Sequence, residues 1–168
     1  GENKLYLRKE IYDVYSTRIL ADIANAKQQG ANFIIFSDDN FTLDVKGFES
    51  LCDAITEAGH NDIRYIIQAS SNGIASSDTL AKKMARAGFR IVFLGIENVS
   101  EENLRLMKKG NIIEKTKLAV KRLHEQNIMI VGGMIIGNPN DKEEDIARNY
   151  EFFVDSQIDF FADQILTP

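Results

Sequence analysis

Residues that bind metals or form disulfides are scarce in this sequence. Its 168 residues include one cysteine, Cys52, and two histidines, His60 and His124. A single cysteine excludes an internal disulfide and is typical of a reducing compartment, so we expect a cytoplasmic protein. The histidines lie far apart, with neither HxH nor HExxH spacing, so we expect no histidine-built metal site. Cys52 lies on the apolar stripe of an expected helix, where we expect it to be buried by packing.

Long hydrophobic runs and an excess of basic residues are also missing. No apolar run approaches the ~20 residues of a membrane-spanning helix, and the N-terminus does not resemble a signal peptide. The net charge of -5 argues against a surface for nucleic acid or anionic membranes. Hydrophobic residues make up 44% of the chain and charged residues 27%, as in ordinary soluble globular proteins. The composition therefore indicates a soluble protein with no membrane or nucleic-acid partner.

Proline is scarce as well, with two residues, and no linker or low-complexity tract interrupts the chain. The length suits one domain that can bury a core, so we assign residues 1–168 to a single domain. The chain begins with Gly1 rather than methionine and stops at Thr167-Pro168, directly after an apolar run. We expect it to be part of a longer protein.

What the sequence does contain is a regular alternation of helices and short apolar strands. The expected strands are 32–36, 63–69, 90–95, 128–136 and 160–166. The expected helices are 11–29, one capped by Asp44 and ending at Gly59, one ending at Gly88, a short one capped by Ser100, 112–126, and one begun by Asn140 or Asp141. This alternation predicts βαβ units, and the nearly continuous apolar strands predict a parallel sheet covered on both faces.

Two closures of such a sheet stay open. An open doubly wound sheet and part of a (β/α) barrel both place ligands at the carboxyl ends of the strands. A whole eight-unit barrel takes ~250 residues, so a barrel built from this chain must be partial. The fold class is α/β in either case, with parallel strands.

Polar residues gather in the segments that follow the strands. These segments read SDDN (37–40), Gln68 with SSN (70–72), GIEN (95–98) and GNPND (137–141). In a parallel sheet they share one rim, so we expect a binding face there. Asp38, Asp39 and Asn40 also suit a plain turn, and a carboxylate at Glu97 suits either an ion pair or a ligand contact. The GGMIIG segment (132–137) lacks the GxGxxG spacing of a dinucleotide loop, so we expect a strand whose glycines permit close approach.

Taken in order, these segments resemble the core of radical S-adenosylmethionine (SAM) enzymes, in particular the group often paired with a cobalamin-binding domain. The similarity is carried by DDNFT (38–42), GIEN (95–98), GMIIGNPNDKEED (133–145) and ILTP (165–168). The resemblance implies a partial (β/α)6 TIM-like barrel, of which this chain holds strands two to six and lacks the first. It also implies the chemistry. A 4Fe–4S cluster on a CxxxCxxC loop reduces SAM to a 5′-deoxyadenosyl radical, which abstracts hydrogen from a substrate.

The cysteines of that loop are not in this chain, and Cys52 is single. The resemblance therefore implies a parent protein that is a radical SAM Fe–S oxidoreductase or transferase, with SAM, a 4Fe–4S cluster and cobalamin as candidate cofactors. We expect the present chain to be inactive alone. The absent first strand would leave a sheet edge exposed, which predicts self-association through that edge.

The resemblance also assigns cofactor-binding residues. Asp38, Asp39 and Asn40 occupy the place where the family holds the amino group of SAM, with Asn40 near a family glutamate. The further assignments are Gln68 and Ser70 at a strand end where many relatives have arginine, Glu97 near the ribose or methionine end, and Gly133, Ile135 and Gly137 beside the adenine. Asp141 is expected to cap the following helix. No residue is assigned as catalytic or as a metal ligand.

Two other functions stay open. A degenerate, non-catalytic barrel that serves as a binding module would share the fold. An unrelated barrel enzyme of the aldolase or phosphate-binding type would require a strand-end lysine or a glycine-rich phosphate loop, and these strand ends show neither.

Overall fold

The computed structural model describes residues 2–97, 112–137 and 141–165, with side chains from residue 15 onward except that of Glu97. Five strands form one sheet in this part of the chain: β1 (Phe33–Ile35), β2 (Arg64–Ser70), β3 (Phe89–Glu97), β4 (Met129–Ile136) and β5 (Phe160–Ile165). All five predicted strands are confirmed, with small differences at their ends.

Helices connect the strands. They are α1 (Glu2–Gln28), the 3-10 helix η1 (Phe41–Asp44), α2 (Val45–Glu57), α3 (Ser71–Ala75), α4 (Leu80–Ala87), α6 (Ile112–His124) and α7 (Glu143–Asp155). Helix α1 begins earlier than predicted, and α3 replaces a segment that we expected to be a polar loop. The short helix predicted after Ser100 lies outside the described residues. None of the helices described here is long and apolar enough to cross a membrane.

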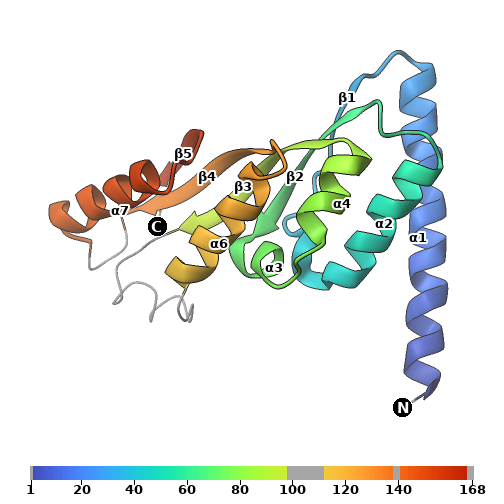
Figure 1. The fold of residues 1–168 in the computed structure, drawn as a ribbon, viewed down its shortest axis with the longest axis horizontal. Helices are drawn as coiled ribbons and strands as arrows, with labels where there is room; N and C mark the ends of the chain where they lie inside the picture. The colour runs from blue at the N-terminus through green and yellow to red at the C-terminus, as the bar shows by residue number, and fades with distance from the viewer. Residues whose placement is uncertain (1, 98–111, 138–140, 166–168) are drawn as a thin grey trace.

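The strands lie in the sheet in their sequence order, and each pair of neighbours is parallel. A doubly wound sheet reverses its strand order at a switch point, and no reversal occurs among these five strands. Figure 1 shows α2, α4 and α6 along one side of the sheet, with α1 and α7 at its two ends. The parallel sheet is confirmed, and the arrangement is that of a partial (β/α) barrel.

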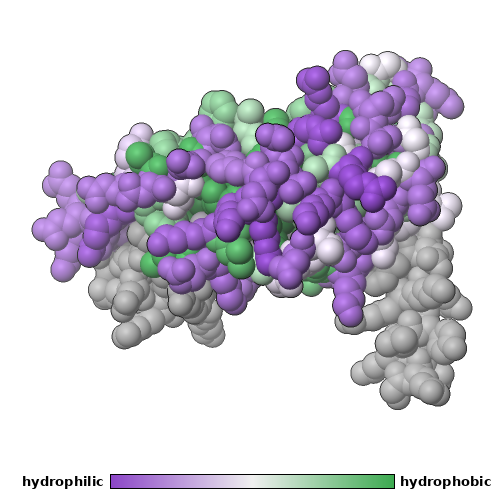
Figure 2. Space-filling model, in the orientation of Figure 1, coloured by the Kyte–Doolittle hydropathy of each residue, from purple (hydrophilic) through white to green (hydrophobic). Residues whose placement is uncertain are grey.

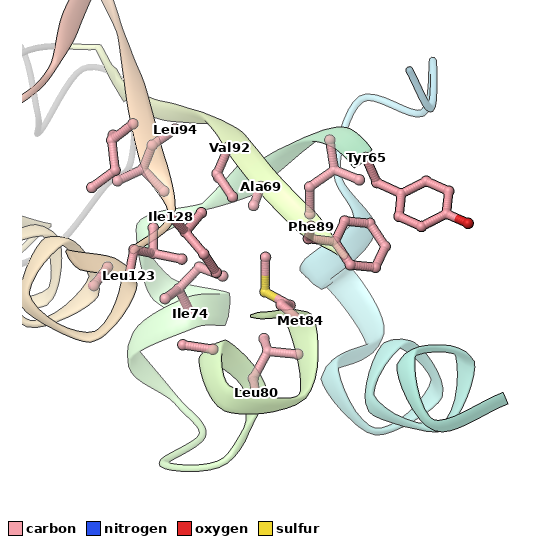
Figure 3. Close-up of a cluster of buried hydrophobic side chains, with 14 of the residues drawn as sticks. Tyr65, Ala69, Ile74, Leu80, Met84, Phe89, Val92, Leu94, Leu123 and Ile128 are labelled. Atoms are coloured by element: carbon pink, nitrogen blue, oxygen red, sulfur yellow. The ribbon is translucent and has the colours of Figure 1, made fainter. Parts of the chain in front are cut away.

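The hydrophobic core lies between the sheet and these helices. Alternate residues of β2 and β3 are buried there, because successive side chains of a strand point to opposite faces. These buried residues pack with apolar residues of α4 and α6. Figure 3 shows this cluster, which includes Ala69, Val92, Leu94, Leu80, Met84 and Leu123. The face seen in Figure 2 is mostly hydrophilic, with smaller hydrophobic patches. The helices therefore cover one side of the sheet with their apolar stripes and turn polar residues outward.

The other face of the sheet is open within the described residues. Ile35 is 64% exposed and Phe160 is 56% exposed, and both point away from the helix layer. The prediction of a sheet covered on both faces is therefore wrong for this part of the chain. The strands are apolar on both faces because the second face lines the concave side of a partial barrel.

The observed helix ends agree in most cases with those predicted from the sequence. The Asp44 Oδ1 atom accepts a hydrogen bond from the Gly47 backbone N at 3.0 Å, so the predicted cap of α2 is confirmed. Gly88 ends α4 with φ of 101°, and a β-carbon there would lie 2.3 Å from the Ile63 carbonyl oxygen. Only glycine fits that position without strain.

The beginning of α7 differs from the prediction. Asp141 does not cap this helix, because Lys142 is the N-cap residue. The carboxylate that completes the cap is that of Asp145, whose Oδ2 accepts a hydrogen bond from the Lys142 backbone N at 3.0 Å. Asp145 stands three residues inside the cap, where a carboxylate can reach back to the free backbone donor. The Asp141 carboxylate instead accepts from the Gly137 backbone N at 2.8 Å.

Cys52 lies on the buried face of α2 and is fully buried. Burial raises the pKa of its thiol, and the nearby Asp53 carboxylate acts in the same direction. The predicted packing role is confirmed. This thiol is neither exposed nor activated for metal binding.

Candidate functional site

A pocket of about 240 Å³ lies at the carboxyl ends of the strands. Every strand after β1 contributes to it, and the segment after β1 adds two residues. The lining residues are Asp39, Asn40, Gln68, Ala69, Ser70, Phe93, Gly95, Gly133, Met134, Ile135 and Gln164. The backbone also places Glu97 at this rim, since its Cα pairs with that of Met134. The predicted convergence of the strand-end segments on one rim is therefore confirmed.

Strand register decides which side chains face this pocket. Paired residues of parallel neighbours point to the same face, and Ser70 pairs with Gly95, which pairs with Gly133. One step further from the rim the same face carries Phe93 and Val131. The concave face thus changes from apolar residues inside the partial barrel to small and polar residues at its rim.

Gly133 leaves room for an aromatic ring beside the pocket. A β-carbon at Gly133 would lie 2.9 Å from Cε1 of Phe93, so the Phe93 ring occupies the space that a side chain would need. The neighbouring Gly132 points the other way, since its β-carbon would lie 2.7 Å from Cε1 of Phe153 in α7. The two glycines therefore serve opposite faces of β4, and only Gly133 shapes the pocket.

A short network of hydrogen bonds supports the rim. The Asn40 Oδ1 atom accepts from the Thr42 backbone N at 2.9 Å and from the Thr42 hydroxyl at 2.7 Å. The Thr42 hydroxyl lies 2.9 Å from the Ser70 hydroxyl and accepts from the Ser70 backbone N at 3.0 Å. The Ser70 hydroxyl in turn accepts from the Gly73 backbone N at 3.1 Å and caps α3. The network joins the segment after β1 to the end of β2.

Thr42 is a residue that the sequence analysis did not single out. It is 4% exposed and connects Asn40 with Ser70, which are far apart in the sequence. Its only sequence signal was its place in DDNFT. Gln164 on β5 was also missed, because the segment FFADQIL shows no clear alternation that would place its amide on the pocket side.

Among the described residues that line the pocket, the charge comes from one carboxylate. Asp39 is exposed and is the only charged residue among the described lining residues, while amides and a hydroxyl supply the other polar side chains. A carboxylate without a neighbouring lysine or arginine attracts cationic groups. The pocket is therefore suited to a ligand with a positive group and several hydrogen-bonding groups.

The structure does not bring all predicted site residues to this pocket. Asn40 borders both it and a second hollow of about 390 Å³ beside α1 and α2, whereas Asp38 borders only the second hollow. Gly137 follows β4 with φ of 93° and is not among the lining residues. Among the described residues, no three histidine, cysteine or acidic residues are grouped as a metal site.

Comparison of the sequence with known proteins identifies the family of this chain. The sequence matches the radical SAM superfamily over residues 6–153. It is 28% identical to the bacteriochlorophyllide d C-12(1)-methyltransferase of Chlorobaculum tepidum, over 79% of this chain and 28% of that protein. It is 30% identical to an uncharacterized methyltransferase of Pyrococcus horikoshii, over 84% of this chain and 30% of that protein. The chain thus spans less than a third of these relatives.

Solved structures show the same fold. The radical SAM methyltransferase TsrM from Kitasatospora setae, solved with cobalamin and a [4Fe-4S] cluster bound, matches with a TM-score of 0.81 and 17% identity, over 89% of this chain and 30% of that one. Coproporphyrinogen III oxidase from Escherichia coli, also a radical SAM enzyme, matches with a TM-score of 0.73 and 15% identity, over 93% of this chain and 37% of that one. At such identities the likeness concerns the fold alone, and the family follows from the sequence match: this chain belongs to the radical SAM superfamily.

Proposed function

We propose that the pocket at the strand ends binds SAM and that the protein containing this chain is a radical SAM enzyme. The observation that carries the proposal is the gathering of Asp39, Asn40, Gln68 and Ser70 at one rim of the partial barrel, in a chain of this superfamily. SAM, once bound and reduced by one electron, supplies a 5′-deoxyadenosyl radical that abstracts hydrogen from a substrate. The substrate is not identified by these residues.

The lining residues fit the chemistry of SAM. The ligand carries cationic sulfonium and ammonium groups, and Asp39 is the carboxylate that would attract them. Its ribose hydroxyls and carboxylate need polar partners, which the side chains of Gln68, Ser70 and Gln164 can provide. Its adenine is flat and mostly apolar, and Ile135, which is on the same face of β4 as Gly133, offers apolar surface near the close backbone approach there.

The residues of this chain do not fit a 4Fe–4S cluster. Such a cluster needs several exposed thiolates, and the one thiol here is buried inside the helix layer. We propose that the cluster ligands belong to a part of the protein outside these 168 residues. The chain alone would then bind SAM without cleaving it. Cobalamin, which the TsrM structure contains, is a further candidate cofactor of the whole protein.

Titration calorimetry of SAM into the chain tests the proposal. The charge-neutralising variant Asp39→Asn should weaken SAM binding by ~fivefold, because it removes an exposed charge attraction and keeps the shape of the side chain. The matched variant Asp155→Asn makes the same change at the exposed end of α7 and should leave the affinity unchanged. No SAM binding by the unaltered chain, or equal effects of the two variants, would contradict the proposed site.

A cytoplasmic location is part of the same proposal. It is supported by the single, buried and unpaired cysteine, which needs no oxidising compartment.

Self-association through β1 is a separate proposal. β1 is the end strand of the described sheet, and its Ile35 side chain is exposed. Unpaired strand edges tend to pair with another chain. Light scattering over rising protein concentration should therefore show dimers or larger species, and Ile35→Lys should reduce them. A strictly monomeric species at all concentrations would contradict this.

A further inference from the structure

We infer that Asn40 binds the pocket's occupant as a hydrogen-bond donor, through its amide nitrogen, and that it selects for the carboxylate of an α-amino acid group. This inference rests on the proposed function, in which the occupant is SAM. The two adjacent residues then bind different groups of the ligand. The Asp39 carboxylate accepts from the ammonium group, and the Asn40 amide donates to the carboxylate beside it.

The orientation of the Asn40 amide follows from its neighbours. A backbone N–H can only donate, so the side-chain atom that faces the Thr42 backbone N at 2.9 Å must be the amide oxygen. The same oxygen accepts from the Thr42 hydroxyl at 2.7 Å. A carboxamide oxygen has two lone pairs, and both are used by Thr42. The amide nitrogen, which has two protons and no acceptor, is the group left for a ligand.

The hydrogen bonds further along the network keep the amide in this orientation. The Thr42 hydroxyl has one proton, which goes to Asn40, so it accepts from both the backbone N and the hydroxyl of Ser70. The Ser70 hydroxyl then accepts from the Gly73 backbone N. Backbone N–H donors thus fix the donor and the acceptor of each hydrogen bond in this network, and Thr42 is buried. Turning the amide around would place N–H groups against N–H and O–H donors, which is unfavourable.

The orientation of the amide determines which ligand group Asn40 can bind. An amide oxygen held in this way cannot accept from an ammonium group, so Asn40 does not share that role with Asp39. An amide N–H pair beside a carboxylate matches an α-amino acid, which presents a carboxylate acceptor beside an ammonium donor. Among the described lining residues no lysine, arginine or histidine competes for the carboxylate. Thr42 acts through Asn40 and is therefore a positioning residue.

The test compares SAM with decarboxylated SAM, which keeps the ammonium group and lacks the carboxylate. In Asn40→Asp the new carboxylate still accepts from Thr42 but replaces the amide donor with an acceptor. Calorimetry with the full chain should show SAM affinity reduced ~tenfold or more, since a charge-assisted hydrogen bond becomes a repulsion. Affinity for decarboxylated SAM should not fall, because the added negative charge attracts its sulfonium and ammonium groups. The matched variant Asn61→Asp, at the other end of β2, should leave both affinities unchanged.

Thr42 supplies the second arm of the test. Thr42→Val removes the hydroxyl and should reduce the preference for SAM over decarboxylated SAM. Thr42→Ser keeps the hydroxyl and should keep this preference. Equal losses for both ligands in Asn40→Asp, or an undiminished preference in Thr42→Val, would overturn the role assigned to Asn40 and leave SAM binding standing. Failure of the unaltered chain to bind either ligand would overturn the proposed function itself.

Discussion

Replacing Gly73 with alanine is expected to lower the free energy of unfolding by about 3 kcal/mol, at the upper end of the usual cost of overpacking. A β-carbon at Gly73 would lie 2.2 Å from both Cβ and Oγ1 of Thr42 and 2.9 Å from its carbonyl oxygen. Thr42 cannot easily move aside, because its hydroxyl and backbone N take part in the network with Asn40 and Ser70. Urea denaturation followed by circular dichroism measures the change.

A second background identifies the cause of that loss. Thr42→Gly removes the two side-chain atoms that a β-carbon at Gly73 would meet, whereas Thr42→Ala would keep one of them. In the Thr42→Gly background, Gly73→Ala should therefore cost markedly less than in the unaltered chain. Contact between the two positions predicts this non-additivity. Equal losses in both backgrounds would show that the Gly73 effect does not come from Thr42.

Gly133→Ala is expected to weaken SAM binding by ~tenfold, which corresponds to about 1.4 kcal/mol. The new β-carbon would lie 2.9 Å from Cε1 and 3.0 Å from Cζ of Phe93, so this ring must shift. Phe93 is half-buried and lines the pocket, and its ring can move toward the open space there. The space for the ligand then decreases, while the cost to folding is small because the ring is not enclosed. Calorimetry of SAM binding and urea denaturation measure the two effects.

The adjacent Gly132 is the matched control on the other face of β4. A β-carbon there would lie 2.7 Å from Cε1 of Phe153 and 2.9 Å from Cγ2 of Ile158. Phe153 is fully buried, so Gly132→Ala should lower the free energy of unfolding by about 2 kcal/mol and leave SAM affinity unchanged. The reverse pattern, with binding lost in Gly132→Ala and kept in Gly133→Ala, would contradict the assignment of the two faces.

The fold could be predicted well because its signals are local. Each strand is a short apolar run, and helix stops such as Gly59 and Gly88 take positive φ as their sequence positions suggested. The direction of the strands followed from the helix in every gap, which allows parallel pairing. The beginning of α7 was wrong because Asp141 and Asp145 both suit a cap, and only the backbone path decides which carboxylate reaches the free donor.

The candidate site could be predicted only in part. The rim was predictable, since parallel strands bring their carboxyl ends to one edge. The roles within the rim depend on contacts between residues far apart in the sequence. The Thr42 hydroxyl contacts Ser70 at the end of β2, and this contact helps to keep the Asn40 amide in the orientation that the Thr42 backbone N sets. Ser71 was expected in a polar loop but is buried, where it accepts a hydrogen bond from the Thr116 hydroxyl at 3.0 Å.

Mapping the ligand by two-dimensional ¹H–¹⁵N spectroscopy tests the central claim most directly. When SAM is added to the ¹⁵N-labelled chain, backbone signals of Asp39, Gln68, Ser70 and Gly133 should shift, because these residues line one pocket from four different segments. Signals near Asn61 and Gln126, before β2 and β4, should stay in place. Shifts confined to that opposite end of the sheet, or no shifts at any SAM concentration, would contradict a SAM site at the carboxyl ends of these strands.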